Sequence, residues 1–128
     1  MTPWKDGERH RISTAEELEI SSRRTDGSLR PYIIIWCVAV DGEVFVRSAN
    51  GPRNPWFRRA VASGSGRIRA GGVEADVDFE PQPTTEALHS SIDTAYHRKY
   101  DRYGPQIVGS VVGPTAASAT LRLVPIEA

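Results

Sequence analysis

Arginine is the residue type that most clearly suggests chemistry in this sequence. The stretch from Arg23 to Arg69 contains nine arginines and no lysine, against three acidic residues, a local excess of six positive charges. A guanidinium group donates paired hydrogen bonds that match the geometry of phosphate and carboxylate groups. The pattern therefore predicts a site for a discrete small anion, unless local ion pairs use up the arginines.

Two of these arginines have a structural explanation. Gly71-Gly72 is typical of a two-residue β-turn between strands predicted at 66–70 and 73–80. In that register Arg69 faces Glu74, and Arg67 faces Asp76. Because cross-strand ion pairs account for both arginines, we exclude them from the site.

Arg47 is the strongest single candidate for binding an anion. Asp41-Gly42 predicts the first hairpin of the chain, whose strands cover 32–40 and 43–48, and the hairpin at Gly71-Gly72 is the second. In its register Arg47 faces Trp36 and has no acidic partner. The two side chains form either a cation–π pair or one wall of a site for a planar anionic ligand.

The loop that follows Arg47 is the best candidate for the anion site. Asn54 is a favourable N-cap and Pro55 suits a first helical position, which predicts a short helix over 56–63. Free N–H groups at a helix N-terminus favour negative charge. Ser48, Asn50 and Gly51 can add donors or allow a close backbone approach. We expect Arg53, Arg58 and Arg59 to surround the loop. The alternative is an ordinary loop, and the sequence is not that of a P-loop.

Two other patterns predict less chemistry. His89, Asp93 and His97 recur every four residues on a helix predicted over 84–103, so they share one face. Such a row is either a set of metal ligands or a solvated face, and we predict no metal site because no second motif supplies a ligand. Cys37, the single cysteine, is interpreted as a small apolar residue of the interior.

The elements that must position these residues are mostly strands. Besides the two hairpins, we expect a strand over 19–23, a closing strand over 120–124 and helical turns opened by a capping box at 13–17. The run 32–40 is apolar on both faces and predicts a central strand. About six strands with one short and one longer helix favour a mainly β fold, a small closed or split barrel.

One outer face of the first hairpin needs a cover. In the predicted register, Ile34, Trp36, Val38 and Phe45 lie together outside the barrel. The long helix, a ligand or a second subunit could cover so large an apolar surface. We predict that the chain forms a homodimer through this face.

Length, charge and hydropathy limit the classes of protein to which this chain can belong. The chain has 128 residues and a mass of 14.1 kDa, which suits one domain spanning 1–128. A formal net charge of zero argues against a nucleic-acid partner. The longest apolar run, of nine residues, is too short to cross a membrane as a helix, and the first residues lack the apolar core of a secretion signal. We expect a cytoplasmic protein with no membrane partner.

The order of motifs resembles the flavin- and deazaflavin-binding split β-barrel proteins. More closely, it resembles a bacterial family of unknown function within that superfamily, similar to deazaflavin-dependent nitroreductase-like proteins, over almost the whole chain. The residues that carry the resemblance are Arg24–Arg30, Trp36, Asp41-Gly42, Val44–Ser48, Gly51, Pro55–Phe57, Gly66–Ile68, Ile92–Tyr100 and Leu121–Pro125.

The resemblance implies a six-stranded split barrel that is usually homodimeric, with FMN or a deazaflavin coenzyme in a groove beside the barrel. It places Arg24, Thr25 and Arg30 near the groove. It brings Arg47, Ser48, Asn50 and Gly51 to the phosphate, and gives Trp56 a part in shaping the pocket. Trp36, the register partner of Arg47, completes the predicted cofactor site.

The implied activity is that of an oxidoreductase, which transfers a hydride between the cofactor ring and a small organic substrate. The alternative is a cofactor-free protein on the same fold, which either binds a small molecule or acts as a non-redox enzyme of the isomerase or cyclase type. A purely structural dimerisation module is a third reading. The sequence identifies neither the substrate nor a proton-transfer residue.

Overall fold

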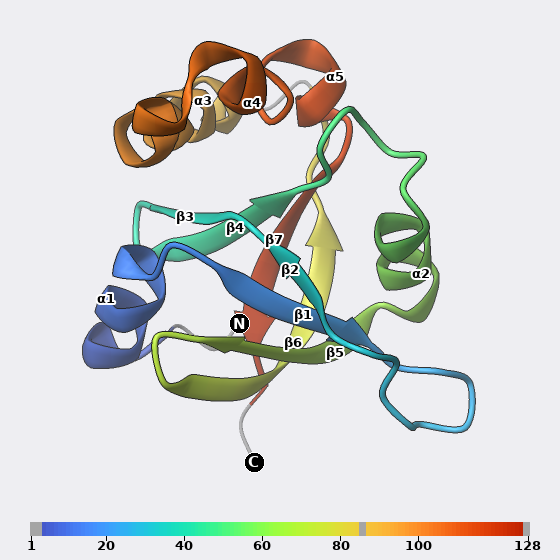
Figure 1. Cartoon of the computed structure of the whole chain (residues 1–128). Helices are drawn as coiled ribbons and strands as arrows, with labels where there is room; N and C mark the ends of the chain where they lie inside the picture. The colour runs from blue at the N-terminus through green and yellow to red at the C-terminus, as the bar shows by residue number, and fades with distance from the viewer. Residues whose placement is uncertain (1–3, 85–86, 127–128) are drawn as a thin grey trace.

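The computed structural model describes residues 4–84 and 87–126, and the described strands form one antiparallel sheet (Figure 1). The sheet has seven strands in the order β2-β1-β5-β6-β7-β4-β3. The strands are β1 (Leu18–Ser22), β2 (Ile33–Ile35), β3 (Cys37–Val40), β4 (Glu43–Arg47), β5 (Ser65–Ala70), β6 (Val73–Pro81) and β7 (Thr120–Pro125). The helices are α1 (Asp6–Thr14), α2 (Pro55–Ser63), α3 (Leu88–Tyr100), the 3-10 turn η1 (Asp101–Tyr103), α4 (Pro105–Gly109) and α5 (Gly113–Ala117).

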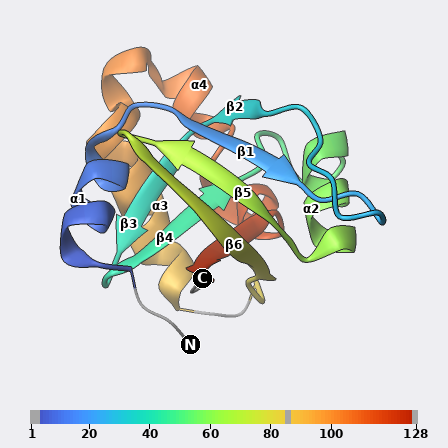
Figure 2. The ribbon, with the colours of Figure 1, turned by 90° about the horizontal axis from the view of Figure 1, so that it is seen from below.

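The chain itself links the two edges of this sheet. The edge strands β2 and β3 are consecutive in the sequence and only Trp36 separates them. The sheet therefore curls into a nearly closed barrel (Figure 2). The prediction of one central strand over 32–40 was wrong, because the chain changes its pairing partner at Trp36. β2 pairs with β1, β3 pairs with β4, and this split raises the strand count from six to seven.

Both predicted hairpins are confirmed. Val40 pairs with Glu43 across Asp41-Gly42, whose φ angles of 51° and 81° suit a two-residue turn of this kind. Ala70 pairs with Val73, which puts Arg67 opposite Asp76 as expected.

The ion pairs of the second hairpin differ in part from the prediction. Arg67 pairs with Asp76 at 3.2 Å and with Glu74 at 3.3 Å. Arg69 lies opposite Glu74 in the register, but its ion pair, at 2.9 Å, is with Glu19. β1 flanks β5 on its other side and brings that carboxylate within reach.

The barrel encloses the main core. Along β5 buried and half-buried residues alternate, as expected for a strand with one face turned inward. The prediction that Cys37 is an interior residue is confirmed, since its side chain is fully buried in this core. The largest residues of this core are Trp4, Ile12, Leu18, Ile20, Phe57, Ile68, Phe79, Leu121 and Leu123.

The helix at the N-terminus differs from the prediction. The capping box at 13–17 does not open a helix, because α1 ends at Thr14. The hydroxyls of Ser13 and Thr14 donate to the carbonyl of His10, one turn earlier, and so serve the end of the helix. Ala15 is already extended.

Helix α3 covers the outer face of the first hairpin. Val38 and Phe45 pack in a second core with Ile92, Tyr96 and Tyr100 of α3. Phe45 is fully buried, so the prediction that a second subunit covers this face was wrong. Ile34 alone of the four predicted residues lies largely exposed, at 60%. No helix among the described residues is long and apolar enough to cross a membrane.

Candidate functional site

Arg47 lies inside the protein and is held by residues of α3, of β7 and of the turn between α4 and α5. Its guanidinium forms an ion pair with Asp93 of α3, and the arginine side chain has no exposed surface. Nε donates to Thr120 Oγ1 at 2.9 Å, and Nη1 donates to the Val111 carbonyl at 2.9 Å. Nη2 lies 3.0 Å from His89 Nδ1 and 3.5 Å from the His89 carbonyl.

These contacts use every donor of the side chain. A guanidinium has five N–H groups, and here each faces an acceptor within the protein. The prediction that Arg47 lacks an acidic partner was wrong. Asp93 lies 46 residues away, so strand register could not identify it. Arg47 has no donor left for a ligand and instead ties β4 to α3.

The loop after β4 is also held by its own contacts. Asn54 forms no side-chain cap at α2, and its Nδ2 donates to Ser48 Oγ and to the Ala49 carbonyl, both at 2.7 Å. The Asn50 amide donates to the Ser110 carbonyl at 2.9 Å. Gly51 is buried with φ at 104°, and a Cβ there would lie 2.8 Å from Thr115 Cγ2. Ser48, Asn50 and Gly51 therefore shape a fixed turn.

Trp36 and Trp56 lie in an apolar groove of about 310 Å³. The Trp36 ring stacks on Tyr100 with centroids 4.0 Å apart, and Trp56 meets Phe57 edge-on at 5.8 Å. Both indoles are half-buried, so each keeps an exposed part. The groove is lined by Ile33, Ile34, Ile35, Trp36, Arg47, Ala49, Asn54, Trp56, Ile107, Ser110 and Val111.

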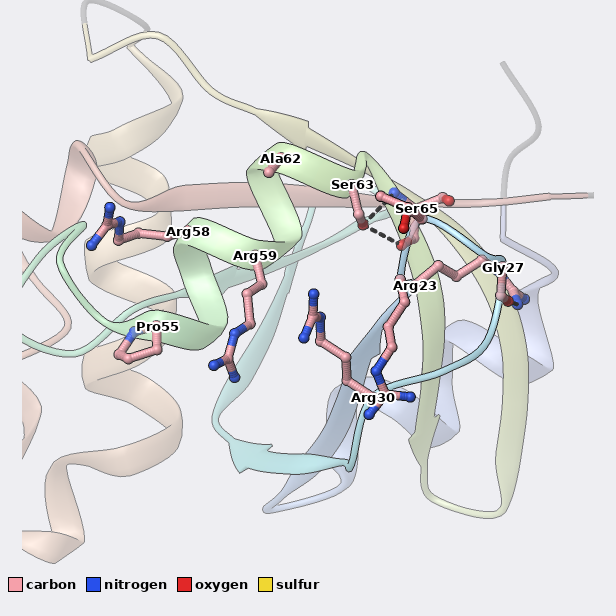
Figure 3. Close-up of a pocket in the computed structure, with 11 residues that line it drawn as sticks. Arg23, Gly27, Arg30, Pro55, Arg58, Arg59, Ala62, Ser63 and Ser65 are labelled. Carbon is pink, nitrogen blue, oxygen red and sulfur yellow. Dashed lines mark hydrogen bonds between the residues drawn. The ribbon is translucent and has the colours of Figure 1, made fainter.

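A second hollow, of about 740 Å³, is bordered by α2 and by the turn after β1 (Figure 3). We call it the arginine pocket, because five arginines line it and none of its described lining residues is acidic. Its lining residues are Arg23, Arg24, Thr25, Gly27, Arg30, Pro55, Arg58, Arg59, Ala62, Ser63 and Ser65.

Two parts of the chain build the arginine pocket. One is the turn between β1 and β2, where the Asp26 carboxylate accepts from the Ser28 amide at 2.9 Å. The other is one face of α2, where the pocket-lining residues begin at Pro55 and recur three, four and seven positions later. This is the spacing of a single helix face. Phe57 and Ala60 are buried in the main core.

The structure thus divides the predicted site residues between two hollows. Arg24, Thr25 and Arg30 line the arginine pocket, whereas Trp36, Arg47 and Trp56 line the groove. Both hollows are bordered by the start of α2, since Pro55 lines one and the next residue, Trp56, lines the other.

Sequence reasoning did not assign Arg23, Ser63 and Ser65 to the site. It placed Arg58 and Arg59 beside the loop after β4, although the helical spacing from Pro55 to Ala62 was a usable signal for a separate pocket wall.

The three side chains His89, Asp93 and His97 on α3 make contacts within the protein. His89 and Asp93 contact Arg47, and His97 Nδ1 lies 2.8 Å from Asp101. Among the described residues no group of three or more such side chains could hold a metal ion.

Cys37 is likewise enclosed. Burial raises the pKa of its thiol, and its Sγ lies 3.6 Å from Lys99 Nζ. A buried, protonated thiol is a poor nucleophile.

The curled antiparallel sheet is a split-barrel fold, and several solved structures have a similar fold. HutZ, a heme storage protein from Vibrio cholerae, is 12% identical with a TM-score of 0.64, over 100% of this chain and 93% of its own. An FAD-binding protein from Mesorhizobium loti is 15% identical with a TM-score of 0.55, over 97% and 91%. A structure described as F420 reductase is 14% identical with a TM-score of 0.54, over 97% of each chain.

The chain belongs to a family of uncharacterized proteins conserved in bacteria (DUF2255), whose model matches residues 8–123. No curated protein matches the sequence. The family and the split-barrel fold agree with the resemblance read from the sequence motifs.

Proposed function

We propose that this protein is a flavin- or deazaflavin-dependent oxidoreductase that acts on a small organic substrate. The observation that carries the proposal is the pairing of an aromatic groove with a cationic pocket along one helix. FMN and the deazaflavin coenzyme each combine a planar ring with an anionic portion, so they call for two such surfaces side by side.

The groove suits the ring. Trp36 and Trp56 offer half-buried aromatic surface, and the isoleucines of β2 add apolar surface beside it. A volume of about 310 Å³ lies at the lower end of the usual range for small-molecule sites. The anionic portion falls to Arg24, Thr25 and Arg30 in the arginine pocket, because the donors of Arg47 are already in use.

The chain would contribute binding and orientation. When bound, the cofactor supplies the hydride chemistry, as in other cofactor enzymes. Trp36 is held from behind by its stack on Tyr100, so it offers a fixed wall against which a ring can be oriented. The Ser110 and Asn54 side chains supply polar groups at the edge of the groove.

One observation favours a second candidate, a cofactor-free protein that binds a small anionic ligand. No carboxylate, histidine or cysteine is found among the described residues that line the groove or the arginine pocket. A reaction that needs proton transfer would have to take its acid or base from the substrate or from water.

The first test is a titration with FMN and with the deazaflavin coenzyme, in which tryptophan fluorescence reports binding. We expect saturable binding of one of them. Trp56→Ala removes one wall of the groove and should weaken binding about tenfold, since stacking on an aromatic ring contributes roughly 1.5 kcal/mol. Val61→Ala, on an exposed position of the same helix, should bind as the wild type does.

Failure of both cofactors to bind the folded protein would overturn the oxidoreductase proposal. Binding of other small anions by the same sample would then favour the cofactor-free alternative.

We also propose that the chain forms a homodimer through the outer edge of β2. This strand ends the described sheet, so its outer edge has no partner strand among the described residues, and Ile33 and Ile34 are exposed at 41% and 60%. Ile107 of α4, exposed at 53%, lines the same groove. An open apolar edge favours association with a second chain.

Sedimentation tests the dimer. Ile34→Glu should shift the protein to monomer, because it places an unpaired charge in a dry interface. Val61→Glu introduces the same charge at an exposed residue of α2, away from β2, and should remain dimeric. A wild-type protein that is monomeric at high micromolar concentration would contradict the proposal.

A further inference from the structure

The positive charges of the arginine pocket are poorly matched by acids. Of the five arginines, only Arg23 pairs with a carboxylate, that of Asp76 at 2.8 Å. This carboxylate is shared, because Arg67 also contacts it at 3.2 Å. The remaining four guanidiniums have no acidic partner among the described residues.

The surroundings of these four side chains leave most of their donors open. Arg24 donates to Ser28 Oγ and to the Leu29 carbonyl, which are both neutral acceptors. Arg30 has a buried Nε with no hydrogen-bond partner among the described residues. Arg58 and Arg59 form no side-chain hydrogen bond or ion pair there, and both are exposed on the face of α2 that borders the pocket.

Such an arrangement of charges by itself lowers the stability of the folded protein. Like charges that gather with few counter-charges repel one another, and a buried donor without an acceptor costs free energy. The chain as a whole is neutral and has sixteen acidic residues that could have balanced this pocket. Because functional sites often reduce the stability of a protein, we expect these arginines to bind a ligand.

We propose that the arginine pocket binds an oligo-anion, a small molecule or ligand segment that carries two or more adjacent phosphate or carboxylate groups. A single phosphate is contacted well by one or two guanidiniums, whereas this pocket presents four unpaired ones from two walls. Its volume of about 740 Å³ lies within the range for whole small-molecule ligands.

Arg30 approaches from the turn after β1, and Arg59 from α2 (Figure 3). A ligand with adjacent anionic groups can meet guanidiniums of both walls at once and pair with more of the four than a single phosphate can. This inference rests on the proposed function and deepens it, because it names the class of anion that the pocket takes, and the binding of that anion is measured without a cofactor.

The experiment compares inorganic pyrophosphate with orthophosphate by isothermal titration and by the thermal midpoint of unfolding. We expect pyrophosphate to bind at least tenfold more tightly than orthophosphate, and citrate more tightly than acetate. Both preferences should shrink as salt is added, since the contacts are charged and partly exposed. A ligand that binds only the folded state also raises the thermal midpoint.

Variants locate the site. Arg59→Gln and Arg30→Gln should each weaken pyrophosphate binding about tenfold or more, while the thermal midpoint without ligand stays equal or rises because repulsion is relieved. Arg98→Gln removes the same charge from an exposed position of α3 outside the pocket and should leave pyrophosphate affinity unchanged. An unliganded midpoint that does not fall separates a binding role from a structural one.

Three results would overturn the inference: no pyrophosphate binding, no preference over orthophosphate, or affinity that Arg59→Gln leaves unchanged. Competition with FMN and, separately, with the deazaflavin coenzyme identifies the source of the anion. Displacement of pyrophosphate assigns the pocket to the anionic portion of the cofactor, and simultaneous binding assigns it to a separate ligand. If FMN binds and pyrophosphate does not, the inference fails while the proposed function stands.

Discussion

At the scale of the residue, the same side chain type serves opposite purposes in this protein. Arg47 is fully buried and donates all five N–H groups to the protein, whereas Arg59 is exposed and pairs with no described residue. A buried arginine of the first kind fixes structure, because any loss leaves a carboxylate and a histidine without their partner. An arginine of the second kind is free to meet a ligand.

Arg47→Ala should therefore reduce the free energy of unfolding by about 3–5 kcal/mol, the usual cost of breaking a buried ion pair. Urea unfolding measures this change. Arg69→Ala, which removes a partly exposed pair with Glu19, is the control and should cost less than about 1 kcal/mol. A stable Arg47→Ala protein with weakened pyrophosphate binding would instead identify Arg47 as a ligand-binding residue.

At the scale of the element, close approaches between strands decide how tightly the sheet curls. Gly66 of β5 pairs with Ser22 of β1, and a Cβ at Gly66 would lie 1.9 Å from the Ser21 carbonyl oxygen and 2.8 Å from Phe79 Cζ. Only glycine fits between this backbone and this ring. The neighbouring turn that follows β1 carries three of the pocket arginines, so the approach also positions one wall of the arginine pocket.

Gly66→Ala is expected to lower the free energy of unfolding by about 3 kcal/mol, at the upper end of the range for overpacking, because backbone cannot yield as a side chain can. Thermal or urea unfolding checks this. Gly109→Ala provides the contrast, since no atom lies within 4 Å of the added methyl group on α4. It should be neutral or slightly stabilising. Equal effects of the two substitutions would refute the argument.

At the scale of the whole molecule, stability depends on two cores that meet at the first hairpin. The barrel core lies on one side of β3 and β4, and the cluster under α3 lies on the other. Two tyrosines of α3 belong to the second core, and burial raises the pKa of both Tyr96 and Tyr100. Their protonated forms are thus part of the folded state.

This gives a pH dependence with a definite sign. A folded pKa above the unfolded one stabilises the protein fully below the ordinary tyrosine value of about 10, and the contribution is lost as the pH rises beyond it. Each tyrosine should then cost about 1.4 kcal/mol of unfolding free energy per pH unit. Tyr96→Phe should reduce this slope by that amount in urea unfolding between pH 9 and 11.5.

The Tyr96→Phe protein is a fair comparison, because the Tyr96 hydroxyl makes no hydrogen bond of normal geometry to a described residue. Cys37 and Lys99 titrate in both proteins, so the difference isolates one tyrosine. An unchanged slope would mean that Tyr96 ionises in the folded protein as readily as in the unfolded chain.

The sequence by itself determined the local features of this protein. Both hairpins, the short helix after Pro55 and the closing strand follow from turn residues and from the alternation of apolar residues, which act over a few positions. Motifs dispersed over the whole chain also carried the resemblance to the split-barrel fold, and the family match agrees with it.

Only the tertiary structure decided which residues become neighbours across long stretches of chain. The change of pairing partner at Trp36, the cover of Phe45 by α3 and the ion pair of Arg47 with Asp93 all join segments that local patterns treat separately. The same holds for the arginine pocket, where α2 meets the turn after β1. The sequence showed an excess of arginine, but a count of charges does not say where the side chains lie in space. Which guanidiniums are buried and satisfied, and which remain open, depends on packing between elements far apart in sequence.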